Sequence, residues 1–140
     1  IGHFRAAGEL LQNYDKINTT LWVAPPTKMD EQKLKEEGYY DIFKKIDTNI
    51  EMPGCSLCMG NQARVKDNSF VLSTSTRNFP NRLGKGANVF LASSELSAIT
   101  AIEGKIPDFD TYMSYYKDID SKKENIFNYM NFHKMDEYKK

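Results

Sequence analysis

The sequence predicts an α/β fold in which helices flank a parallel sheet, followed by a helical C-terminal tail. Short apolar runs bounded by turn residues alternate with longer segments whose apolar residues recur every three or four positions, which is typical of α/β proteins. The chain has 140 residues, of which 40% are apolar, and this suffices for about one domain with its own core. We therefore divide it into an α/β part, residues 1–107, and a helical extension, residues 108–140.

The N-terminal segment predicts a helix, a strand and a second helix. In residues 3–14 the apolar side chains recur at helical spacing along one stripe. Residues 21–24 are an apolar run that ends at two prolines, which is the pattern of a short buried strand. Thr27 and Asp30 resemble a helix-capping pair, so we expect a helix from there to Glu37.

The rest of the chain continues this alternation. A further helix is expected over residues 39–46. Residues 70–72 and 89–92 are apolar runs flanked by turn residues, typical of parallel strands buried on both faces. Residues 94–103 follow a capping serine and precede a glycine, which predicts a helix. From residue 108 onward the apolar residues again recur at helical spacing.

The charge distribution excludes several classes of function. The 19 basic and 19 acidic residues balance, which gives no support to a general nucleic-acid or membrane-surface binder. The longest stretch without a charged side chain has 12 residues, 52–63, whereas a membrane-spanning helix needs about 20. Residues 53–88 differ, with five basic residues and one acidic residue in a part rich in Gly, Ser and Thr. We expect an anion to be held there.

The N-terminal residues and the cysteine content bear on whether the chain is part of a longer polypeptide and on its cellular compartment. It begins with Ile1 and carries neither the charged start nor the apolar core of a secretory signal, so we expect it to be part of a longer polypeptide. Two cysteines three positions apart exclude a disulfide scaffold. A reducing compartment is the simplest interpretation, and we expect a cytoplasmic protein.

The cysteines are the first candidate site. Cys55 and Cys58 lie on a predicted turn flanked by glycines, and three interpretations compete: buried structural thiols, a metal or cluster site, and a redox pair. A redox pair normally opens a long helix, and the residues after Cys58 are poor helix formers. A zinc site needs four ligands, and the two histidines, His3 and His133, lie at opposite ends of the chain. Spacing alone leaves the three interpretations open.

An arginine pair is the second candidate site. Arg77 and Arg82 lie in a loop rich in hydroxyls and amides, directly after a predicted strand. Their planar guanidinium groups are suited to bidentate capture of a carboxylate or a phosphate. The alternative is two exposed arginines in a polar loop.

Taken together, these motifs resemble the aconitase superfamily, in its bacterial B type. The sequence Pro-Gly-Cys-Ser-Leu-Cys-Met-Gly-Asn begins at residue 53, and Arg-Asn-Phe-Pro-Asn-Arg begins 19 residues after the second cysteine. The resemblance extends over residues 2–8, 21–27 and 104–107 and so covers most of the chain.

The resemblance implies a 4Fe-4S cluster and a hydro-lyase activity. Cys55 and Cys58 match two of the family's three cluster ligands, and the third is expected shortly upstream of Ile1. Arg77 and Arg82 match two substrate-binding arginines. The implied reaction interconverts citrate and isocitrate through cis-aconitate, and dehydration of 2-methylisocitrate is a further expected activity. This chain would then be the later part of an aconitase-type α/β domain, inactive by itself.

The resemblance also implies partners, and one residue departs from its pattern. Thr76 stands where many mitochondrial-type members carry Asn, so the polar contact expected of that Asn is not carried over to this residue. The family's general base is a serine with no matching motif here, so Ser73, Ser75 and Ser94 are not assigned that role. The expected partners are a tricarboxylate, the remaining domains of the same polypeptide and, in the cluster-free state, RNA, with no membrane. The alternatives are an RNA-binding regulatory role and a small thiol-redox module.

Overall fold

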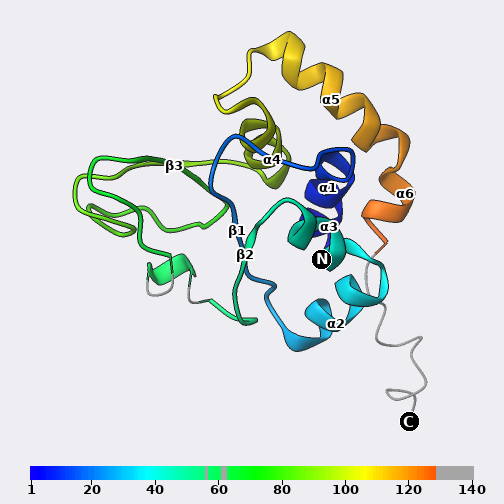
Figure 1. Cartoon of the computed structure of the whole chain (residues 1–140), viewed down its shortest axis with the longest axis horizontal. Coiled ribbons are helices and arrows are strands. Elements are labelled where there is room, and N and C mark those ends of the chain that lie inside the picture. Colours follow the sequence, from blue (N-terminus) through cyan, green and yellow to red (C-terminus); the bar gives the residue numbers. More distant parts are fainter. Residues whose placement is uncertain (56, 61–62, 129–140) are drawn as a thin grey trace.

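Helices packed around α1 form the main body of the molecule (Figure 1). The computed structural model describes residues 1–55, 57–60 and 63–128. The helices are α1 (Gly2–Leu11), α2 (Lys28–Glu36), α3 (Tyr39–Lys45), α4 (Ser94–Glu103), α5 (Phe109–Ser121) and α6 (Lys123–Ile126). α1 packs against α3, α4, α5 and α6. The helices predicted from apolar spacing are therefore confirmed, with ends that differ by a few residues. No helix in the described part of the chain is long and apolar enough to cross a membrane.

Apolar side chains from five of these helices form one core. Its buried members include Ala6, Leu10 and Leu11 of α1, Phe43 of α3, Ala98, Ile99 and Ile102 of α4, Ile119 of α5 and Ile126 of α6. Full burial of each large side chain contributes roughly 1.5–3 kcal/mol. The C-terminal helices thus share a core with the first helix, while the predicted boundary at residue 107 stays a prediction. Residues 129–140 of the predicted extension lie outside the described residues.

Side-chain caps explain why the predicted helices begin where they do. The Thr27 hydroxyl accepts a hydrogen bond from the Asp30 N–H at 3.1 Å and starts α2. The Ser93 hydroxyl accepts one from the Leu96 N–H at 3.1 Å and starts α4. Such a cap contributes about 1 kcal/mol. α4 ends at Gly104, which has a φ of 76°, a backbone conformation that favours glycine.

The strands form two separate parallel pairs. β1 (Trp22–Val23) pairs with β2 (Asn49–Ile50), and β3 (Phe70–Ser73) pairs with β4 (Asn88–Leu91). In the second pair, Phe70 is opposite Asn88 and Ser73 is opposite Leu91. The α/β class and the parallel direction are confirmed. Sequence reasoning missed β2, because two residues without an apolar run give no periodic signal.

Within this segment, β3 and β4 are not buried on both faces, so that prediction is wrong for the described chain. Phe70 is 79% exposed, Phe90 48% and Leu91 51%. The Phe70 and Phe90 rings stack on each other, with centroids 6.4 Å apart. The physical reason is that α3, α4, α5 and α6 pack on α1, whereas β3 and β4 mainly contact each other and lie to one side of the helical body (Figure 1).

An ion pair with a buried arginine joins the two ends of the helical body. The Arg5 side chain is 5% exposed and donates two hydrogen bonds of 2.7 Å to the Glu37 carboxylate. It also donates to the backbone carbonyls of Ile126 and Asn128. Arg5 therefore connects α1 to the end of α2 and to the chain that follows α6.

We expect Arg5→Gln to lower the free energy of unfolding by ~2–4 kcal/mol, because Glu37 and two carbonyls lose a buried charged partner. Lys33→Gln is the matched control. Lys33 lies 3.8 Å from the same Glu37 carboxylate but is 44% exposed, so its loss should change stability by less than ~1 kcal/mol. Urea unfolding of both variants measures the difference, and equal losses would contradict this role for Arg5.

Candidate functional site

The two cysteines lie on a short turn, and neither forms a disulfide. Cys58 belongs to the 3-10 turn η1 (Leu57–Met59) and is half-buried, whereas Cys55 is exposed. The buried structural pair is therefore not what the structure shows. In the described residues around the pair, η1 is the helical element present, which differs from a redox pair at the start of a long helix.

Gly60 allows the cysteine turn to approach the arginine loop closely. Its φ of 71° lies in the region that favours glycine. A Cβ atom at this position would lie 1.9 Å from the backbone oxygen of Arg82. No other residue fits this contact without a shift of the backbone.

Arg82 joins the cysteine turn to the end of β3. The residue is 2% exposed, and its Nη1 donates to the Cys58 carbonyl at 3.0 Å while its Nη2 donates to the Ser73 hydroxyl at 2.9 Å. Its Nε is buried and has no hydrogen-bond partner among the described residues. The interpretation of two exposed loop arginines is thus wrong for Arg82, because the cysteine turn covers it.

Arg77 lies in a more exposed environment than Arg82. Its side chain is exposed, and its Nη1 lies 2.6 Å from the sulfur of Met59. Because Met59 directly follows Cys58, this contact brings the second arginine to the same turn. The structure therefore brings together Cys58, Arg77 and Arg82, which lie up to 24 residues apart in the sequence.

Two serines connect the strand end to this group. Ser73 and Ser75 are half-buried, whereas Thr74 and Thr76 are exposed, as expected for an extended chain whose side chains alternate. The Ser75 N–H donates to the Ser73 hydroxyl at 3.2 Å. The Ser75 hydroxyl in turn accepts from the Arg77 N–H at 3.1 Å.

The two thiols have opposite electrostatic environments. A hydrogen bond from Ser75 lowers the pKa of Cys58, burial opposes it, and Cys55 and the charges of Arg82 and Arg77 add to the lowering. The pKa of Cys55 is raised, chiefly by its hydrogen bond with Cys58. The deprotonated form is the one that binds metals, so Cys58 is the better prepared ligand of the pair.

The described residues supply part of a metal or cluster site. The adjacent thiols of Cys55 and Cys58 fit two positions in the ligand set of an iron-sulfur cluster. In residues 1–55, 57–60 and 63–128, no three side chains of His, Cys, Asp or Glu gather closely enough to hold a metal ion. His3 is therefore not brought to the cysteines, and His133 lies outside the described residues.

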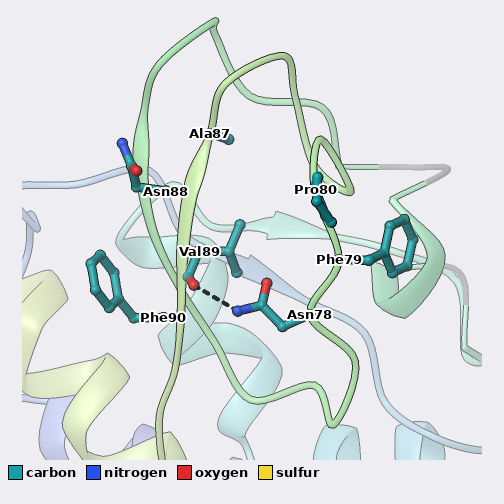
Figure 2. Close-up of a pocket in the computed structure, with 7 residues that line it drawn as sticks. All are labelled: Asn78, Phe79, Pro80, Ala87, Asn88, Val89 and Phe90. Carbon is teal, nitrogen blue, oxygen red and sulfur yellow. Dashed lines mark hydrogen bonds between the residues drawn. The ribbon is translucent and has the colours of Figure 1, made fainter.

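A shallow cavity of about 350 Å³ adjoins the arginine loop, between this loop and β4 (Figure 2). Asn78, Phe79 and Pro80 form one side, and residues 87–90 form the other. The Asn78 side chain donates to the Val89 carbonyl at 2.9 Å and fixes the loop against β4.

Sequence reasoning identified the cysteines and the arginines but missed the residues that assemble them. Gly60 and Ser73 gave no signal of their own, since single glycines and serines are common in loops. The alternation of Ser and Thr over residues 73–76 was the available signal for the inward serines.

Fold and site define an α/β segment in which paired thiols meet an arginine loop at the end of a parallel strand. The chain belongs to the aconitase family: the model described as "Aconitase family (aconitate hydratase)" matches residues 2–104.

Alignments with named relatives cover nearly the whole chain, beyond the residues that the family model matches. The proteins named aconitate hydratase B from Salmonella typhimurium LT2 and Escherichia coli K12 are 58% and 57% identical to the chain over 139 residues. Each alignment covers 99% of this chain and 16% of the relative. A protein named 3-isopropylmalate dehydratase large subunit, from Flavobacterium johnsoniae, is 37% identical over 77% of this chain and 24% of its own length. The chain thus spans about one sixth of the aconitate hydratase B relatives.

We expect Gly60→Ala to destabilise the protein more than Gly38→Ala. Gly38 also has a positive φ, of 82°, but a Cβ there meets nothing within 4 Å. Gly38→Ala should therefore cost only the backbone strain, ~1–2 kcal/mol. Gly60→Ala should cost a further ~1–3 kcal/mol from the clash with Arg82. Urea unfolding compares the variants, and losses of the same size would show that the close approach is not needed.

Proposed function

We propose that this segment belongs to an iron-sulfur hydro-lyase that interconverts citrate and isocitrate through cis-aconitate. The observation that carries the proposal is the convergence of Cys58, Arg77 and Arg82 on one turn. The names of the relatives support both the substrate class and the dehydration chemistry. Dehydration of 2-methylisocitrate is proposed as a second activity, because its carboxylates and hydroxyl offer the same groups for recognition.

Cys55 and Cys58 would hold the cluster together with a third cysteine from outside this chain. A bound cluster with one iron free of cysteine would supply a Lewis acid for the substrate's hydroxyl and carboxylate. The protein's contribution here is to lower the pKa of the Cys58 thiol, through Ser75 first and through the nearby arginine charges, which favours the thiolate that binds metal. Two free thiols also support our proposal of a cytoplasmic protein.

The arginines would bind the substrate carboxylates in different ways. Arg77 is exposed, so its guanidinium can turn to make two parallel hydrogen bonds to a carboxylate. Arg82 already uses both Nη atoms within the protein. Buried under the cysteine turn, it would contribute its positive charge to the site, and its buried Nε is a donor that no described residue engages. None of the described side chains is assigned as the general base.

The exposed apolar surface supports the rest of the same polypeptide as a partner. Phe70 and Phe90 stack in the open on β3 and β4. A groove of about 510 Å³ runs between the end of β4 and the start of α5, with Ile106 and Phe109 exposed along it. Because the alignments leave 84% of each aconitate hydratase B relative unmatched, we propose that other domains cover these surfaces.

We expect Cys58→Ser in the full-length enzyme to abolish the cluster and the activity while the fold is kept. Serine is close in shape to cysteine but is a poor ligand for iron-sulfur clusters. Iron and sulfide per protein, together with far-UV circular dichroism, measure the two effects. A fully loaded, active Cys58→Ser enzyme would refute the cluster site.

The wild-type full-length enzyme tests the thiol-redox alternative, for which the adjacent thiols and the lowered pKa of Cys58 are the support. A wild-type protein that binds no iron but forms a reversible disulfide between Cys55 and Cys58 would establish that alternative.

We expect Arg77→Lys to reduce kcat/KM by ~10- to 1,000-fold at full cluster occupancy. The substitution keeps the charge but removes the bidentate geometry. Arg64→Lys is the matched control, because Arg64 is an exposed arginine of the same basic segment and should leave the kinetics unchanged. Steady-state kinetics normalised to cluster content provide the measurement. Equal kinetics in both variants would exclude a substrate contact at Arg77.

A further inference from the structure

Met59 places a thioether sulfur against the exposed arginine of the site. It directly follows Cys58 in η1 and is 44% exposed. Its Sδ lies 2.6 Å from Nη1 of Arg77. A thioether sulfur is a weak hydrogen-bond acceptor, whereas a carboxylate accepts two strong, charge-assisted hydrogen bonds from a guanidinium. A substrate carboxylate therefore displaces this contact readily, and Arg77 stays available for binding.

Oxidation would turn this sulfur into the anchor of a strong acceptor. Hydrogen peroxide transfers one oxygen to a thioether: the O–O bond breaks, a sulfur–oxygen bond forms, and the second oxygen leaves as water with both protons. The sulfur loses two electrons, the peroxide gains them, and the product is a polar methionine sulfoxide. At Met59 the new oxygen would lie beside the guanidinium that the sulfur already contacts.

Contact with a cation, rather than exposure, is what distinguishes Met59. Met52 is more exposed, at 71%, but no described residue forms a hydrogen bond with its side chain. Oxidation of Met52 would therefore add a polar group without engaging an arginine. Access to Met59 follows from the role of its neighbour, since a route that admits a tricarboxylate to Arg77 also admits peroxide, which is much smaller.

We propose that Met59 is an oxidation site that controls substrate binding, because its sulfoxide oxygen accepts a hydrogen bond from Arg77 and competes with the substrate carboxylate. The inference rests on the proposed function, in which Arg77 binds that carboxylate. A hydrogen bond to a charged group changes an equilibrium by about 10- to 100-fold, so KM should rise by about this factor. The added oxygen is on neither cysteine, so the effect should persist after the cluster is rebuilt.

The first test oxidises the full-length wild-type enzyme, Met59→Leu and the control Met52→Leu with hydrogen peroxide. Leucine has about the volume of methionine and no sulfur to oxidise. Ferrous iron, sulfide and a thiol reductant then rebuild the cluster, whereas methionine sulfoxide is reversed only by methionine sulfoxide reductase. The readouts are the mass of the peptide that holds Met59, iron and sulfide per protein, and kcat and KM before and after the reductase.

We expect the oxidised wild type and Met52→Leu to gain one oxygen at Met59 and to show KM raised by about 10- to 100-fold at full cluster content. The reductase should restore KM. Oxidised Met59→Leu should keep the KM of its own untreated sample. An unchanged KM in wild type that carries oxygen at Met59 would overturn the inference, and so would an equal rise in Met59→Leu or a Met59 that peroxide leaves unmodified while it oxidises Met52.

The second test replaces the sulfoxide by an amide. Met59→Gln places a permanent oxygen acceptor at about the same distance along the side chain, and Met59→Leu is its apolar counterpart. Without peroxide, KM of Met59→Gln should exceed that of Met59→Leu, and equal values would contradict the competition for Arg77. If neither variant folds, the wild type decides alone, because its KM must then follow the fraction of Met59 that carries oxygen.

The proposed function fails separately from this inference. A wild-type enzyme without a cluster, or Arg77→Lys with wild-type kinetics, refutes the proposed role of the site and the inference with it. An Arg77→Lys enzyme with reduced kcat/KM, beside a wild type whose KM ignores oxidation of Met59, refutes the inference alone.

Discussion

The burial of the Arg82 guanidinium is the constraint on which the site depends. A cation removed from water is costly unless its donors find acceptors. Here a backbone carbonyl of the cysteine turn and a hydroxyl at the end of β3 accept from it. The cysteine turn can lie against the backbone of Arg82 because Gly60 has no side chain. The turn, the strand end and the loop are consequently fixed relative to one another.

The surrounding structure has two parts: a helical body with a buried core, and a strand pair, β3 and β4, with exposed side chains. The helices around α1 bury the apolar core and carry most of the caps, so they form the stable frame. The paired strands β3 and β4 expose aromatic side chains and carry the arginine loop at their edge. This arrangement puts the chemistry on the part of the segment that is least covered by its own residues, as is common for functional loops on a rigid scaffold.

Local rules predicted the helices well, because caps and apolar spacing act within a few residues. The caps at Thr27 and Ser93 are where the sequence indicates them. The burial of β3 and β4 within this segment was mispredicted. An apolar run indicates that a strand will be buried, but it does not show which element packs against it. At the site, residue types located the cysteines and arginines. The burial of Arg82 depends on contacts between distant segments, which spacing cannot reveal.

The shared core of α1 with α5 and α6 has a consequence for the family. The family match ends at residue 104, yet Ile119 and Ile126 lie beyond it and belong to the same core as Leu10 and Leu11. The face of α1 that they cover is apolar and would be exposed without them. A family member that lacks this extension must therefore cover the same face with a different element.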